Sequence, residues 1–178
     1  VARSILDRRF EGQSKKTDAP FLSASLRSAE AYDVLDGLEL HVTCAPERWW
    51  RALALAEQEL RRALEHGFQR AELDAVRFDA LRESSVSVER ESTQSSPDLV
   101  GVILNATENR FVPTSAAVQR DLLEPAYRAL TVEACQDALS AAWGRGELSI
   151  TTMGNLDLGP QAARQLDVAW SESRARRV

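Results

Sequence analysis

The sequence predicts an α+β fold in which helices pack on one face of a small antiparallel sheet. Three observations support this prediction. Apolar and polar residues alternate strictly from Leu38 to Cys44, which is typical of a half-buried strand. Long segments with the 3.6-residue apolar period of a helix fill the middle of the chain. Alternating segments stand before and after these helices, so strands and helices occur in separate runs.

Three segments are predicted as strands. The first covers residues 21–32 and is followed by Asp36-Gly37, a dipeptide typical of a hairpin turn, and then by the strand 38–44. The segment 147–153 alternates again, and we expect it to lie in the same sheet as 38–44.

Helices are predicted from apolar periodicity and from capping residues. One helix ends near residue 10, and the polar, breaker-rich segment 11–20 after it is expected to be a flexible loop. Two long helices, 47–66 and 70–91, are expected to cover a single face of the sheet. Four shorter helices are predicted. They are residues 98–109, a helix that begins after the Thr114-Ser115 cap, residues 132–143, and a last helix that ends at Trp170.

Length and composition indicate one globular domain. The 178 residues are 44% hydrophobic, which is enough to bury a core. Residues 1–10 have the pattern of a helix end, and Arg174–Val178 has no cap signal. We therefore expect residues 1–178 to be a single α+β domain excised from a longer polypeptide.

Charge and hydropathy exclude two classes of partner. The 22 basic and 27 acidic residues are mixed along the chain, whereas nucleic-acid binding requires a basic face. The longest apolar run is far shorter than the roughly 20 residues of a membrane-spanning helix. The two cysteines, Cys44 and Cys135, are interpreted as small buried residues and not as metal ligands or a disulfide.

One segment, Arg62-Ala-Leu-Glu65-His66, differs by a single residue from the inverted zinc motif H-x-x-E-H. In that motif two histidines hold zinc and the glutamate polarises the attacking water. Arg62 stands at the first histidine position, and a protonated guanidinium has no lone pair for a metal. The other histidine, His41, is expected on the outward face of its strand. We therefore predict no catalytic, cofactor-binding or metal-binding residue in this chain.

The adjacent pair Trp49-Trp50 opens one of the long helices. Neighbouring helical positions point about 100° apart, so one indole can face the core while the other reaches a neighbouring domain. Trp49 and Trp50 are therefore the candidate interdomain contact.

The order of these features resembles the insulinase (pitrilysin) family of zinc proteases. Residues 46–67 followed by 68–73 are similar to the family's long helix, which ends at a G-F pair before a second long helix begins. The turn at 130–134 and the segment 150–157 follow in the order that the family uses. The similarity covers the chain from Phe21 to about Leu158. The resemblance also implies that the domain is incomplete at its N-terminus, since a whole family domain begins with a strand and a helix that would precede Val1.

The resemblance implies a function for the whole polypeptide. Family members are built from homologous α+β domains around a proteolytic chamber, and only one domain carries the complete zinc site. This chain is expected to be a non-catalytic (inactive) peptidase domain that helps form the chamber and position peptide substrate, while zinc resides in the catalytic domain of the parent. Its partners would be other domains of the same protease or a homologous subunit, and bacterial relatives suggest the periplasm or cell envelope.

Two alternatives stay open. The first alternative is an independent protein-binding module that uses its exposed tryptophan face. The second is a catalytic domain with a degenerate site. The family's substrate-holding Arg and Tyr cannot be placed, so Tyr32 and Tyr127 receive no role.

Overall fold

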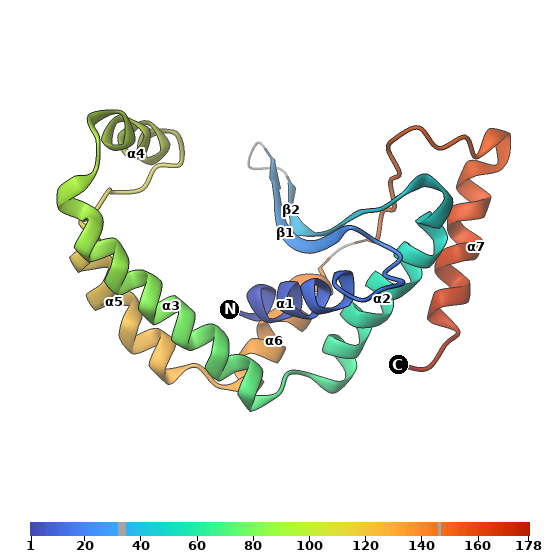
Figure 1. Cartoon of the computed structure of the whole chain (residues 1–178), viewed down its shortest axis with the longest axis horizontal. Helices are drawn as coiled ribbons and strands as arrows, with labels where there is room; N and C mark the ends of the chain where they lie inside the picture. The colour runs from blue at the N-terminus through green and yellow to red at the C-terminus, as the bar shows by residue number, and fades with distance from the viewer. Residues whose placement is uncertain (32–34, 146) are drawn as a thin grey trace. The chain divides into compact units, whose positions relative to one another are not determined.

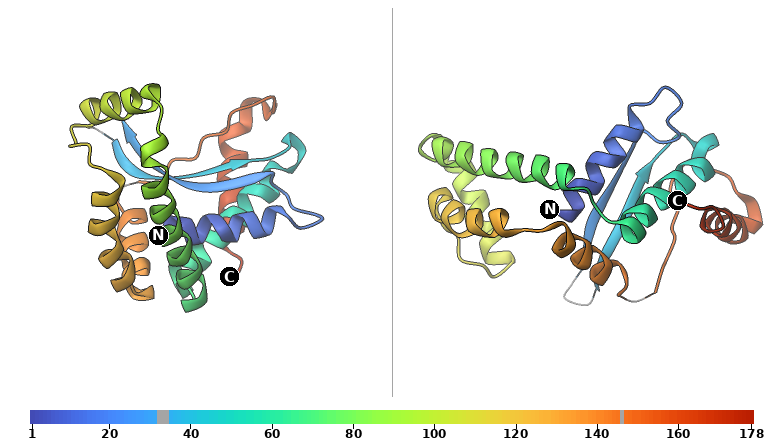
Figure 2. Two further views of the ribbon diagram at one scale, coloured as in Figure 1. Left: turned by 60° about the vertical axis from the view of Figure 1, so that its left-hand side comes forward. Right: turned by 90° about the horizontal axis from the view of Figure 1, so that it is seen from below.

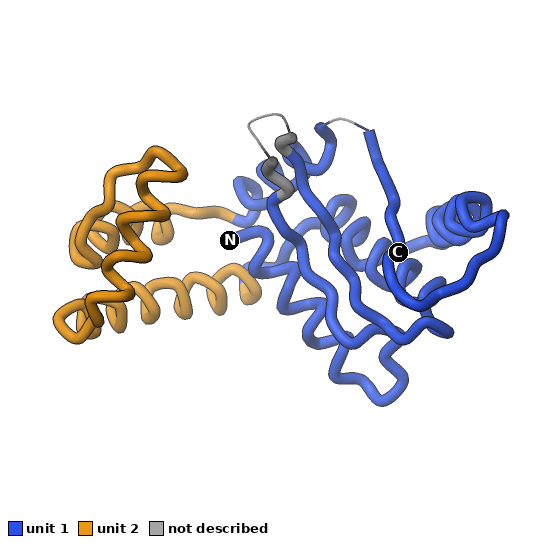
Figure 3. The backbone as a smooth tube through the Cα atoms, turned by 90° about the horizontal axis from the view of Figure 1, so that it is seen from above, with its two compact units in different colours: residues 1–70, 132–178 blue, residues 71–131 orange. Residues whose placement is uncertain are grey.

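The computed structural model describes residues 1–31, 35–145 and 147–178. The chain divides into two compact units, one formed by residues 1–70 with 132–178 and the other by residues 71–131 (Figure 3). The first unit holds the sheet, and the second is helical. The expectation that the whole chain forms a single domain stays a prediction.

The sheet of the first unit is an antiparallel pair, β1 (Ser23–Ala31) and β2 (Leu35–Thr43). Leu26 lies opposite Leu40 on one face, while the next pair along, Arg27 and Glu39, lies on the other face. Helices α1 (Ala2–Ser14), α2 (Trp49–His66) and α6 (Val132–Trp143) contact the strands and lie on one side of the hairpin (Figures 1 and 2). The predicted α+β class, with helices on one face of a small antiparallel sheet, is confirmed.

The hairpin turn predicted at Asp36-Gly37 is wrong. These two residues belong to β2 and pair with Glu30 and Ala29 of β1. Tyr32 and the two residues after it lie outside the described part of the chain. The dipeptide has turn propensity, but the register that buries Leu26 beside Leu40 extends the ladder past it.

The strand predicted at 147–153 is also wrong, because this segment has no strand structure and is not part of the sheet. Leu148 is 53% exposed and Met153 is 93% exposed. Alternation favours a strand only where a partner edge and an apolar layer cover one face. In the described residues this segment has neither, since β1 and β2 pair only with each other.

The core of the first unit joins helices α1 and α2 to the sheet. Phe10 of α1 packs edge-on against Phe21, with ring centroids 6.3 Å apart. Asp7 of α1 accepts a hydrogen bond from the backbone N–H of Leu26 at 2.8 Å, which ties the helix to β1. Other buried apolar side chains of this unit are Ile5, Leu6, Ala52, Ala56, Leu60, Ala63, Phe68, Cys135 and Leu139.

Helix boundaries follow local signals closely. A 3₁₀ turn at Pro46–Arg48 leads into α2, and Gly67 ends α2 with a φ of 73°, a conformation that favours glycine. Helix α1 extends to Ser14, so the first four residues of the predicted loop 11–20 are helical. After a 3₁₀ turn at Gly159–Gln161, α7 (Ala162–Arg174) packs along α2.

The second unit contains most of α3 (Arg70–Arg90), together with a 3₁₀ turn at Glu91–Thr93, α4 (Ser96–Glu108) and α5 (Ala116–Ala129). Helix α3 belongs mainly to the second unit and the sheet belongs to the first, so the prediction that α3 covers the sheet beside α2 stays a prediction. Within the first unit, α1 and α6 contact the strands together with α2. The apolar residues of α3 do not form one stripe, and Phe78 is 68% exposed. Within the unit, Arg77 donates to the carbonyl oxygens of Tyr127 and Leu130 and so caps the end of α5.

Helix α4 begins with a complete capping box. The Ser95 side chain accepts a hydrogen bond from the Asp98 backbone N–H, and the Asp98 carboxylate accepts from the Ser95 backbone and hydroxyl. These bonds lower the pKa of Asp98. The cap is therefore one residue earlier than Ser96, the residue that the Ser-Pro pattern favours.

Candidate functional site

The residues of the incomplete zinc motif lie along the last turns of α2. Arg62 forms an ion pair with Glu59, whose Oε1 also accepts a hydrogen bond from Gln13 at 2.7 Å. The side chain of Glu65 is 50% exposed, and His66 Nε2 lies 3.1 Å from the carbonyl oxygen of Val178. The three side chains of the motif thus serve separate contacts.

His41 lies where the strand pattern predicted it, on the polar face of β2. Its Nδ1 is 3.7 Å from the Glu39 carboxylate, and its side chain is 42% exposed. Among residues 1–31, 35–145 and 147–178, no three histidine, cysteine, aspartate or glutamate side chains gather in a group that could hold a metal ion. Neither Cys44, which is half-buried, nor Cys135, which is buried as predicted, is in a disulfide.

A buried polar cluster joins the middle of α2 to the end of α7. Arg61 forms a bidentate ion pair with Glu57, at 2.7 and 3.3 Å, and both side chains are almost completely buried. Arg61 also donates to the carbonyl oxygens of Ser173 and Arg176, at 3.1 and 2.8 Å. The hydrogen bond that Arg61 donates to the Glu57 carboxylate raises the pKa of Arg61. One guanidinium therefore neutralises a buried carboxylate and caps the C-terminal end of α7.

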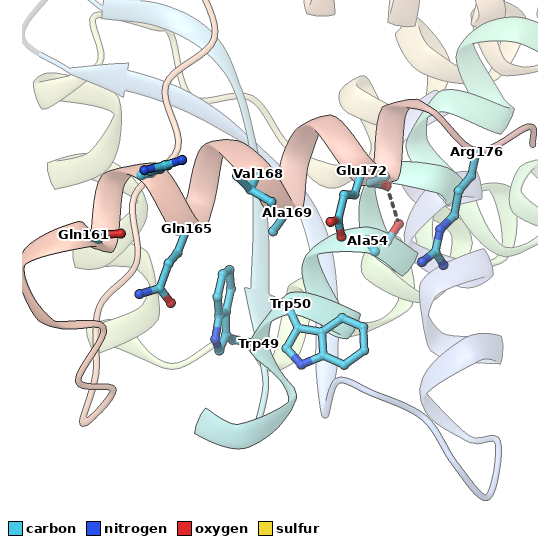
Figure 4. A pocket seen from close by; sticks show the side chains of 11 residues that line it. Trp49, Trp50, Ala54, Gln161, Gln165, Val168, Ala169, Glu172 and Arg176 are labelled. Atoms are coloured by element: carbon cyan, nitrogen blue, oxygen red, sulfur yellow. Dashed lines mark hydrogen bonds between the residues drawn. The ribbon is translucent and has the colours of Figure 1, made fainter.

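Ser173 completes this cluster. Its hydroxyl contacts both the Glu57 carboxylate and the carbonyl oxygen of Ala54, the latter at 3.2 Å (Figure 4). A hydroxyl has one proton to donate, so the two acceptors share it. The contact fixes α7 against α2 at a point where the side chains of Ser173 and Glu57 are both buried.

Beyond Ser173, toward the start of α2, the seam between the two helices opens into a pocket of about 310 Å³. Trp49, Trp50 and Ala54 of α2 form one wall, and Val168 and Ala169 of α7 form much of the other. In Figure 4 the Trp49 ring stands between Gln165 and Trp50, while Arg176 marks the opposite end. The pocket has an apolar centre and polar ends.

A second hollow, of about 460 Å³, adjoins the first. The two share Trp50, Ala54 and Arg176, so Trp50 stands between them. The second hollow is lined further by the segment that follows α1, including Lys16 and Pro20. We call the two hollows together the Trp50 groove.

The Trp50 groove is basic although the chain carries a net charge of −5. Its charged lining residues are two acidic ones, Asp18 and Glu172, and four basic ones, Lys16, Arg51, Arg164 and Arg176. In the described part of the chain, none of the four basic side chains has an ion-pair partner. They are held along an apolar floor with their charge available to solvent or to a ligand.

The predicted tryptophan pair lies at the centre of this groove. Trp50 is 49% exposed and Trp49 is half-buried, so the difference between them is one of degree and neither is a full core residue. Their role as an interdomain contact stays a prediction. Sequence reasoning missed the Glu57–Arg61 pair, although a glutamate on the apolar stripe with an arginine four residues later was a usable signal.

Known proteins match this chain in structure and not in sequence. No family model and no curated protein sequence matches the chain. Its fold is that of domains in insulinase-family proteases, so the resemblance seen in the sequence is confirmed at the level of the fold.

Three solved structures illustrate the match. A predicted insulinase family protease from Yersinia pestis gives a TM-score of 0.76 at 15% identity, covering 98% of this chain and 38% of that chain. The periplasmic protease PqqL from Escherichia coli gives 0.76 at 14%, covering 99% of this chain and 20% of that chain. The first half of PqqL, solved separately, gives 0.73 at 15%, covering 99% and 38%. The chain thus spans well under half of each of these structures.

A helix that crosses a membrane must be long and apolar enough to span the hydrocarbon core of the bilayer. No helix among the described residues has the length and apolar character needed to cross a membrane.

Proposed function

We propose that this chain is a non-catalytic domain of an insulinase-like zinc metalloprotease, in which it helps form the proteolytic chamber and position peptide substrate. The observation that carries the proposal is the position of Arg62 in the motif and its ion pair with Glu59. Arg62 occupies the position where the inverted zinc motif has a histidine. The shared fold, which covers a minor part of larger protease chains, supports the domain role.

The proposal places zinc in a different domain of the parent polypeptide. Other domains of that polypeptide, or a homologous subunit, would be the partners, and peptide would be the substrate. Because one structural neighbour is described as periplasmic, we also propose a periplasmic or cell-envelope location. Fractionation of cells that express the parent protein tests the location.

Metal analysis tests the absence of a zinc site. The purified chain is expected to retain no stoichiometric zinc after dialysis and to cleave none of a mixture of fluorogenic peptides, since it lacks two neutral imidazoles on one helix face. One zinc per chain that is lost in His66→Ala would contradict the proposal. The variant Arg62→His supplies the missing imidazole one turn before His66, and its gain of zinc would identify Arg62 as the block.

The role in the parent protein has its own test. The reading frame on either side of this segment is expected to encode an intact H-x-x-E-H helix with a downstream glutamate. In that longer protein, Trp50→Ser should lower kcat/KM for peptides while zinc content stays constant. Unchanged kinetics would favour the second candidate, an independent protein-binding module, which the half-exposed Trp50 in its groove supports.

A further inference from the structure

We propose that the Trp50 groove binds an acidic amphipathic helix of a partner protein. The inference rests on the proposed non-catalytic role and deepens it, because it names the chemistry of one partner. It joins three features of the groove: its helical walls, its apolar centre with a half-exposed tryptophan, and its excess of unpaired basic side chains.

The shape of the groove fits a helix. Its walls are the surfaces of α2 and α7, which run in the same direction, since Ala54 contacts Ser173 and Arg61 contacts Arg176. The α7 lining residues Gln165, Val168 and Glu172 recur at the spacing of one helical face. Arg164 lies near the start of α7 and Arg176 lies just past its last residue, Arg174. The 13 residues of α7 span about 20 Å, which is enough to accompany a docked helix of similar length. A third helix in such a groove presents apolar anchors at i, i+3 or i+4, and i+7.

The centre of the groove supplies the anchor site. Trp50 stands between the two hollows with half of its surface exposed, and Ala54 and Ala169 leave space beside it. Tryptophan is enriched among the residues that contribute most to binding, because its large ring buries much area at little entropic cost. An apolar side chain of the partner would pack between Trp50 and Val168.

The excess of basic residues in the groove favours a partner with negative charge. Arg164 and Arg176 line the first hollow, while Lys16 and Arg51 line the second. All four lack ion-pair partners within the described residues, in contrast to Arg61 and Arg62 on the same helix pair. Carboxylates near both ends of a docked helix would pair with these basic side chains.

A nucleic acid would also meet basic and aromatic side chains, but the groove favours a peptide. Two carboxylates, Asp18 and Glu172, lie in its walls, and Leu55 and Val168 make its floor apolar. A nucleic acid carries a phosphate at every nucleotide, so some phosphates would face these carboxylates, and none would gain from the apolar floor. A helix can place its carboxylates opposite the basic side chains alone. A peptide helix uses both surfaces.

Two synthetic helices of about 16 residues test the inference. One carries a leucine stripe with glutamates near both ends, and the other has lysine in place of every glutamate. Calorimetry with the full chain is expected to show binding of the acidic peptide and at least about tenfold weaker binding of the basic one, with affinity falling as salt rises.

Variants locate the site. Trp50→Ser, and separately the pair Arg164→Glu with Arg176→Glu, should each weaken binding of the acidic peptide about tenfold or more. The matched controls Phe78→Ser and Arg82→Glu, both at exposed positions outside the groove, should leave it unchanged. The charge variants keep the inference testable if Trp50→Ser fails to fold.

Several results would overturn the inference. These are no binding of the acidic peptide, equal binding of the basic peptide, retention of affinity by the charge variants, or tighter binding of a single-stranded oligonucleotide. Zinc content and peptide cleavage are measured on the same preparation. A chain that binds zinc refutes the proposed function, whereas a zinc-free chain that ignores the acidic peptide refutes only this inference.

Discussion

The contact between α2 and α7 has two halves, one around Arg61 and one around Trp50. Charged side chains are buried in the first half and exposed in the second. In the first half, Arg61, Glu57 and Ser173 are buried and satisfy one another. In the second, Arg164 and Arg176 line an open groove without ion-pair partners among the described residues. A charge removed from water needs a partner, but one that keeps its water does not. The first half should therefore govern stability and the second recognition.

Removing Arg61 should have the largest effect. Arg61→Ala removes the bidentate partner of the buried Glu57 carboxylate, which keeps only the Ser173 hydroxyl and Arg174, 4.0 Å away, and it uncaps the end of α7. We therefore expect a loss of about 3 kcal/mol in the free energy of unfolding. Urea denaturation measures it. The double variant Glu57→Met with Arg61→Met removes both charges and should recover most of the loss. If Arg61→Ala unfolds at the same urea concentration as the natural chain, the buried half does not hold the helices together.

Removing the Ser173 hydroxyl should have a smaller effect. In Ser173→Ala the Glu57 carboxylate keeps Arg61 but loses one hydrogen bond, which should cost about 1–2 kcal/mol. Thermal unfolding compares it with Ser171→Ala, an exposed position on the same helix where we expect no change. Equal melting temperatures for the two variants would show that the hydroxyl makes no net contribution.

Neutralising the groove should change stability least. Arg164→Gln and Arg176→Gln remove charges that have no partner, so the free energy of unfolding should stay within about 0.5 kcal/mol of the natural chain. The backbone carbonyl of residue 176 remains available to Arg61. Urea titrations in parallel with Arg61→Ala give the direct contrast. A loss comparable to that of Arg61→Ala would mean that the open half carries stability as well.

Predictions from the sequence succeeded where a signal was local and strong. The apolar period and the Gly67 stop placed α2 and α3 to within two residues, and the cap at Ser115 placed α5. Alternation placed β2, and it put His41 on the polar face of the sheet. Each of these signals acts between residues that are close along the chain.

Predictions failed where a distant partner decides the outcome. The segment 147–153 alternates like a strand, but it gains strand structure only if an edge pairs with it. The Asp36-Gly37 dipeptide favours a turn, but the register of β1 on β2 places it inside the ladder.

The sequence by itself determined the α+β class, most helix boundaries and the loss of the first histidine from the zinc motif, because propensity, caps and side-chain chemistry are properties of neighbouring residues. Only the tertiary structure decided that Glu57 and Arg61 meet Ser173, more than a hundred residues away, and that Trp50 comes to stand among four basic side chains from three segments. Burial sets both results, since it depends on which helices pack together and not on the order of residues within any one of them.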